Sequence, residues 1–138
     1  MELTLNWKEK LSFDGSDAEQ HQVLISNDED ENGQRKGLSP LQLLALGLGA
    51  CSSMDVISIM QKKRQNVDDF EIKISYERRD EQPRIWTSAH IEYIVTGKDI
   101  DPAALERSIQ LSVENYCAAH AMLEKAVPIT TGYQIIES

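Results

Sequence analysis

Hydrophobic and polar residues alternate along several parts of the chain, and one long apolar run lies between Leu38 and Met60. Alternation with a period of two is typical of a strand that buries one face. Leu3, Leu5 and Trp7 share one face in this way, and Phe70–Tyr76 alternates without a break. We also expect strands over 21–26, 84–96 and 129–136, with turns at 14–16 and 77–83 and an irregular, mobile loop over 27–36.

The apolar run predicts a long helix from Ser39 to about Arg64. Ser39 is a good N-cap, Pro40 suits the first helical position, and Gln42 stands three residues after the cap, as in a capping box. The middle of this helix is apolar on nearly every side, which predicts burial all round. Gly47 and Gly49 are costly inside a helix, and the usual reason to tolerate them is close approach of another backbone.

A second helix is predicted to start at the cap Asp101 and to place Leu105, Ile109 and Val113 along one stripe. A short third helix over 118–125 precedes the last strand. The resulting order, β-β-β-α-β-β-α-(α)-β, indicates an α+β domain with helices against antiparallel sheet. We find no repeat or internal boundary, so residues 1–138 are expected to form a single domain.

The composition of the chain excludes some kinds of partner and indicates where the protein is located. The net charge is −9, with 23 acidic and 14 basic side chains, which argues against nucleic acid and anionic membrane surfaces as partners. The start, Met1 to Asn6, has no secretory pattern, and polar residues interrupt the apolar run, so we expect a cytoplasmic protein. Its two cysteines are then thiols at rest, and any disulfide between them would be transient or catalytic.

Cys51 and Cys117 stand 66 positions apart, and their spacing alone allows two unrelated core residues, because free cysteine is often buried. Cys117 and His120 could share a helical face as metal or proton-transfer partners. With three histidines and no further ligand cluster, we expect no zinc, and His120 is interpreted as a pocket-wall or surface residue.

The segment from Gly37 to Met54, with its Gly-x-x-Pro opening and its Ala-Cys at 50–51, resembles the central helix of the OsmC/Ohr family of small dithiol proteins. The second half of the chain is similar too, with Asp101-Pro102, a helix, Cys117 and then Val127-Pro128 before a closing strand. The resemblance covers nearly the whole chain. It implies an OsmC-like fold, with antiparallel sheets around a long buried central helix, and an intertwined homodimer.

The resemblance also implies an activity. Cys51 would be the peroxidatic residue of a cofactor-free, metal-free, thiol-dependent reductase of organic hydroperoxides, and Cys117 would be the resolving residue. An external dithiol would reduce the resulting disulfide. The pair would lie beneath a mostly apolar pocket, which favours organic peroxides because their tails gain burial energy.

In peroxidase members of the family, an N-terminal arginine stabilises the thiolate and is held by a glutamate just after the helix-opening proline. Leu41 and Gln42 follow Pro40 here, and the first arginine of the chain is Arg35, so Arg35 and Gln42 are the candidates for these two roles. Asp55, one helical turn beyond Cys51, would oppose thiolate formation if it faces the same way. A non-catalytic member that binds a small apolar ligand, or that merely assembles, is therefore the alternative function.

Overall fold

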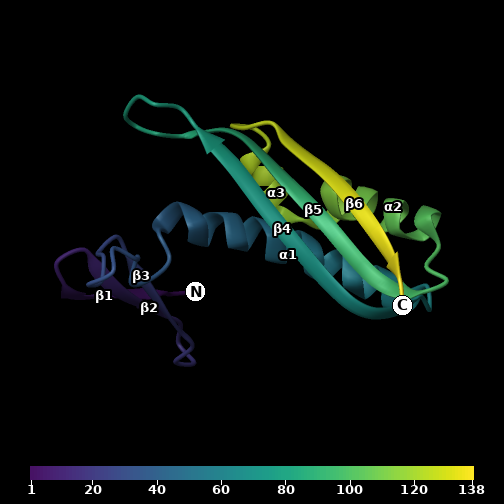
Figure 1. The fold of residues 1–138 in the computed structure, drawn as a ribbon, viewed down its shortest axis with the longest axis horizontal. Helices are drawn as coiled ribbons and strands as arrows, with labels where there is room; N and C mark the ends of the chain where they lie inside the picture. Colours follow the sequence, from purple (N-terminus) through teal and green to yellow (C-terminus); the bar gives the residue numbers. More distant parts are fainter. The chain divides into compact units, whose positions relative to one another are not determined.

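The computed structural model describes every residue from Met1 to Ser138 and contains the predicted strands and helices in the predicted order (Figure 1). The turn predicted at 14–16 is wrong, because these residues belong to a strand, Ser12–Ser16, that pairs with both of its neighbours. The elements are β1 (Thr4–Glu9), β2 (Ser12–Ser16), β3 (Gln22–Ser26), α1 (Pro40–Lys62), β4 (Asn66–Arg78), β5 (Trp86–Lys98), α2 (Pro102–Leu111), the π-helix η1 (Ser112–Tyr116), α3 (Ala118–Leu123) and β6 (Ile129–Glu137). They form two compact units, Met1–Leu44 and Ala45–Ser138, and α1 begins in the first and continues into the second.

The first unit is built on an antiparallel sheet in the order β1-β2-β3. Its apolar residues remain largely uncovered. Leu3 is 82% exposed and Trp7 is 66% exposed, and every residue of β1 is exposed. An apolar groove of about 490 Å³ lies in this unit, lined mainly by aliphatic side chains, among them Leu3, Leu5, Val23, Ile25 and Leu43. The sheet therefore has an apolar surface that the rest of this unit does not cover.

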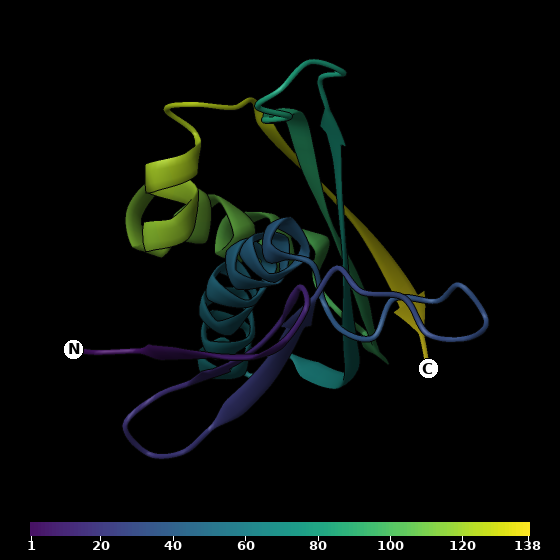
Figure 2. The ribbon, with the colours of Figure 1, turned by 90° about the vertical axis from the view of Figure 1, so that its left-hand side faces the viewer.

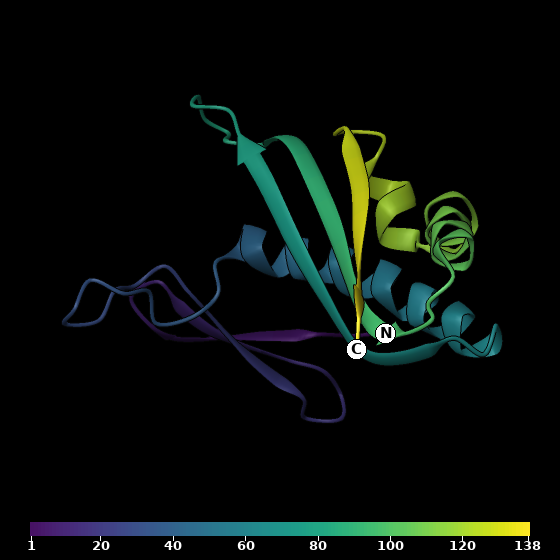
Figure 3. The same cartoon turned by 45° about the vertical axis from the view of Figure 1, so that its right-hand side comes forward.

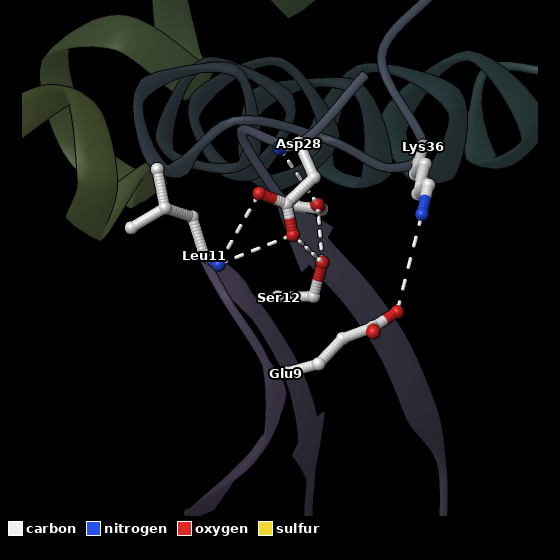
Figure 4. A network of polar contacts seen from close by, with 6 residues as sticks. Glu9, Leu11, Ser12, Asp28 and Lys36 are labelled. Atoms are coloured by element: carbon white, nitrogen blue, oxygen red, sulfur yellow. Dashed lines mark hydrogen bonds and ion pairs between the residues drawn. The ribbon is translucent and has the colours of Figure 1, made fainter. Parts of the chain in front are cut away.

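The loop over 27–36, predicted to be irregular and mobile, is tied to the start of β2 (Figure 4). Asp28 accepts hydrogen bonds from the Leu11 N–H at 3.1 Å and from the Ser12 hydroxyl at 2.6 Å. The hydrogen bond from Ser12, more than any other contact, lowers the pKa of Asp28. Lys36 at the far end of the loop lies 3.9 Å from Glu9. These contacts fix both ends of the charged segment.

The predicted capping box opens α1. The Gln42 N–H donates to the Ser39 hydroxyl at 3.2 Å, and Gln42 Oε1 accepts from the Ser39 N–H at 3.0 Å. Together these two bonds satisfy two backbone donors that a helix start otherwise leaves open.

The second unit contains a sheet in the order β4-β5-β6. β4 and β5 are antiparallel, as predicted, but β5 and β6 run parallel, so the expectation of purely antiparallel pairing is wrong for this pair. The reason is the connection: α2, η1 and α3 lie between the two strands, and such a helical crossover returns the chain in the same direction.

The helices of this unit lie on one side of the β4-β5-β6 sheet (Figures 2 and 3). Alternate residues of β5 point to that side and are buried, among them Ile91, Tyr93 and Val95. Leu48, Val56 and Met60 of α1 and Leu105 of α2 complete the fully buried apolar set. The core therefore sits between one sheet face and α1 and α2.

Burial of α1 on every side, predicted from its composition, is wrong for the single chain. Its buried residues are Ala45, Leu48, Gly49, Ser52, Val56 and Met60, which recur every three or four positions. The opposite side remains open, with Leu46 47% exposed and Met54 69% exposed. By length and composition α1 could also cross a membrane, but core helices of soluble proteins pass the same test. The side of α1 opposite its buried residues is apolar as well, but it is not covered.

Gly49 and Gly47 of α1 differ in what surrounds them. A Cβ built on Gly49 would lie 2.5 Å from Ile74 Cδ1 of β4, whereas a Cβ on Gly47 would meet nothing within 4 Å. The close approach of another backbone, predicted from these glycines, is therefore wrong: at Gly49 the close neighbour is a side chain, and at Gly47 there is none.

We expect Gly49→Ala to lower the free energy of unfolding by about 1 kcal/mol, because overpacking of about 1–3 kcal/mol exceeds the gain of alanine in helix propensity. Gly47→Ala is the matched control, since it adds the same methyl to the open side. It should gain up to about 1 kcal/mol of stability, because alanine favours the helix more than glycine and no clash opposes this gain. Chemical denaturation of both variants measures the difference, and equal or reversed losses would contradict the packing seen at Ile74.

Candidate active site

The Cys51 side chain is carried by the middle of α1, where small residues surround it. Ser52, the next residue, is fully buried and faces Tyr93 of β5, whereas Cys51 itself is partly exposed. The α1–sheet packing therefore places this thiol at the edge of the core.

Cys117 reaches the same place through the π-helix. The Cys117 N–H donates to the Ser112 carbonyl at 2.8 Å, the i to i−5 bond that defines a π-turn. Sequence analysis predicted one helix with Val113 on the Leu105–Ile109 stripe, but α2 ends at Leu111, and Ser112 faces the core. Cys117 then caps α3, and its sulfur accepts from the His120 N–H at 3.3 Å.

The two thiols lie beside one another, and both are free. Burial, above all, raises the pKa of the Cys117 thiol to about 11; the hydrogen bond from the His120 backbone opposes this rise, and the neighbouring Cys51 thiol and the Asp55 carboxylate add to it. Asp55 thus disfavours the thiolate of Cys117, whereas its predicted effect on Cys51 stays a prediction. Folding thus brings together two sulfurs that stand 66 positions apart in sequence.

A chain of buried hydroxyls runs next to the thiols. Tyr93 and Ser52 share a short hydrogen bond, Ser52 Oγ lies 3.0 Å from Ser112 Oγ, and Ser112 donates to Asp55 Oδ2 at 3.0 Å. A carboxylate can only accept, so Ser112 is the donor to Asp55, Ser52 donates to Ser112, and Tyr93 donates to Ser52. Each hydroxyl proton therefore points toward the carboxylate.

The pKa of Tyr93 reflects the groups around its hydroxyl. Burial, more than any other cause, raises its pKa, the hydrogen bond with Ser52 lowers it, and the charges of Cys117 and Asp55 raise it. Since Cys117 and Asp55 each act on Tyr93, the thiols, the phenol and the carboxylate form one electrostatic unit.

The two candidates for thiolate activation lie in the first unit. Arg35 is exposed, its backbone bridges to Glu29, and its side chain forms no ion pair within Met1–Leu44. Gln42 uses its acceptor oxygen in the capping box. Their roles at Cys51 stay predictions.

His120 is only 3% exposed, so the surface position suggested from sequence is wrong, and the pocket-wall position stays a prediction. Its Nδ1 atom lies 3.3 Å from Glu124 Oε2. His90, by contrast, lies in β5 and forms hydrogen bonds with Thr130 at 2.6 Å and with Glu92 at 2.9 Å.

Sequence reasoning did not find Ser52, Tyr93 and Ser112. Ser52 follows Cys51 directly and Tyr93 stands in the buried register of a strand, so both had weak signals. Ser112 had none, because only the π-turn points it inward.

We expect Cys117 to react with iodoacetamide at least a hundredfold more slowly than free cysteine at pH 8. With its pKa raised to about 11, roughly one thiol in a thousand is ionised at that pH, against about one in four for an ordinary cysteine. The rate should rise about tenfold per pH unit. Peptide mass spectrometry after timed alkylation measures it, and a plateau below pH 9 would contradict the assigned environment.

Known proteins match this chain over most of its length. The family model described as OsmC-like protein matches residues 33–132. The chain is 43% identical to protein YhfA of Escherichia coli (strain K12) over 136 residues, which cover 99% of this chain and 98% of YhfA.

Solved structures with the same fold include a hypothetical protein from Aquifex aeolicus VF5, with 28% identity, a TM-score of 0.87 and coverage of 99% of this chain and 96% of that one. The organic hydroperoxide resistance protein OhrB of Bacillus subtilis has a TM-score of 0.64 at 16% identity over 96% of each chain, a likeness of fold alone. From the matching family model and the full-length similarity to YhfA, the chain belongs to the OsmC-like protein family.

Proposed function

We propose that the protein is a cysteine-based peroxidase that reduces organic hydroperoxides. The observation that carries this proposal is the pair of free thiols, Cys51 partly exposed and Cys117 buried beside it. The fold shared with proteins named for organic hydroperoxide resistance supports the same activity.

The reaction follows from the different exposure of the two sulfurs. The Cys51 thiolate attacks the distal oxygen of the hydroperoxide, the O–O bond breaks, and the alkoxide leaves and takes up a proton as the alcohol. Cys51 is then a sulfenic acid. Cys117 attacks its sulfur, a disulfide forms, and the hydroxyl leaves as water with the Cys117 proton. An external dithiol restores both thiols by exchange and is itself oxidised to a disulfide.

Thiolate formation on Cys51 needs a compensating positive charge or donor. No ion pair reaches the thiols or Asp55 from within Ala45–Ser138. We assign this role to Arg35, supplied by the first unit of the same chain or of a second copy, with Gln42 as a hydrogen-bonding support.

A homodimer is part of the proposal. Leu46 and Met54 on α1 are exposed, and so are the apolar residues of β1. We propose that a second copy of the chain covers these exposed apolar side chains. Sedimentation velocity should show a species of twice the chain mass, and Leu46→Glu with Met54→Glu should shift it to the monomer.

The test of the activity is a thiol titration. Two thiols should disappear rapidly when stoichiometric cumene hydroperoxide is added to the native protein, and no disulfide should form in Cys51→Ser or Cys117→Ser. If the thiols persist during long exposure to cumene hydroperoxide, the peroxidase proposal is wrong. Persistent thiols would favour the alternative, a non-catalytic protein that binds a small apolar ligand.

A further inference from the structure

Asp55 is the one carboxylate held directly against the thiol site by buried groups. It stands four residues after Cys51, so the two side chains are neighbours on one face of α1. Its Oδ2 accepts from Ser112, a fully buried residue, and its charge acts on both Cys117 and Tyr93.

The hydroxyl chain fixes this charge in place. Tyr93, Ser52 and Ser112 donate in sequence toward Asp55, and aligned hydrogen bonds in a poorly solvated site strengthen one another. All three residues are fully buried, so water does not compete for these bonds. No Lys, Arg or His side chain of Ala45–Ser138 pairs with Asp55.

We infer that Asp55 is a specificity-determining residue of the thiol site, and that its fixed negative charge makes Cys51 react with neutral molecules in preference to anionic ones. This inference rests on the proposed function and names its substrate class: neutral organic hydroperoxides, in place of hydroperoxides that carry a carboxylate near the peroxide group.

The physical reason is charge repulsion near a low-dielectric surface. An anionic reagent that approaches the Cys51 sulfur brings its charge within about 7 Å of the Asp55 carboxylate, and at an effective dielectric constant of about 40 the repulsion lowers the encounter rate roughly tenfold. A neutral reagent of the same shape experiences none of this repulsion.

Two alkylating reagents test the inference without any peroxidase activity. Iodoacetamide is neutral, iodoacetate is anionic, and both react with a thiol by the same displacement of iodide. We expect Cys51 to prefer iodoacetamide about tenfold more strongly than free cysteine does, and we expect Asp55→Asn to abolish this extra preference. Asparagine is nearly isosteric, and its amide oxygen still accepts from Ser112, so the fold should persist.

Two controls separate a local charge from other effects. Asp55→Glu keeps the charge and should restore the preference. Asp68→Asn removes an exposed carboxylate of β4 and should leave the preference unchanged. An unaltered ratio in Asp55→Asn, or the same loss in Asp68→Asn, would overturn the inference.

The same variants are then compared with cumene hydroperoxide, which is neutral, and with cumene hydroperoxide that carries a carboxylate on its ring, which is anionic and has its charge near the peroxide group. If neither oxidises the thiols while the alkylation ratio follows Asp55, the peroxidase proposal fails and the role of Asp55 stands. If both are reduced with no change of preference in Asp55→Asn, the activity stands and the inference fails.

Discussion

Cys51→Ser is expected to lower the rate of cumene hydroperoxide reduction at least about a thousandfold, because a serine hydroxyl is not ionised at neutral pH and the attack on oxygen needs the thiolate. The buried Cys117 cannot take over, since its raised pKa of about 11 leaves it almost wholly protonated. Peroxide consumption with excess dithiothreitol measures the loss.

Cys117→Ser is the informative counterpart. Its first turnover should proceed and leave Cys51 as a sulfenic acid that no second thiol resolves, so dimedone should trap it and excess peroxide should drive it to the sulfinic acid. Equal activity of the two variants would show that the cysteines do not have different roles.

The largest expected loss of stability comes from a glycine far from the thiols. Gly97 lies near the end of β5, and a Cβ built on it would collide with the backbone carbonyl of Asn66 and lie 2.7 Å from Ile100 Cδ1. A backbone oxygen cannot rotate away as a side chain can. We expect Gly97→Ala to lower the free energy of unfolding by about 3 kcal/mol and the midpoint of thermal unfolding by roughly 10 °C.

Gly132→Ala is the matched control for Gly97→Ala. Its added methyl would meet the carboxylate of Glu92, which can move, so the loss should be clearly smaller. Thermal melts of both variants provide the comparison. A loss at Gly132 as large as that at Gly97 would mean that Glu92, tied by His90 and Gln134, is as rigid as backbone.

The elements of this fold were predictable because their signals are local. The capping box at Ser39 and Gln42, the cap at Asp101 and the alternation of 70–76 each depend on residues close in sequence, and the structure confirms them. The direction of β6 was not predictable in this way. The direction of β6 relative to β5 depends on the helical connection between the two strands, and the residues of β6 alone do not encode it.

The thiol site was predictable only in part. The cysteines stand out because the chain has two, and the family resemblance linked them. The hydroxyl chain from Tyr93 to Asp55 draws on β5, α1 and the π-turn, and such long-range contacts leave no periodic trace in sequence. The exposed side of α1 was also not predicted, because a helix that is apolar all round does not show which of its sides the chain covers.

The π-helix makes the position of one sulfur depend on chain length. η1 holds one residue more per turn than an α-helix of the same rise, and Cys117 follows it directly. Losing a single residue there would let the segment rewind as α-helix, and the fourth residue after Ser112 in an α-helix points nearly the same way as the fifth residue in a π-turn. A single deletion in η1 should therefore keep the sulfur beside its partner, whereas a second deletion would turn it away by about 100° around the helix axis.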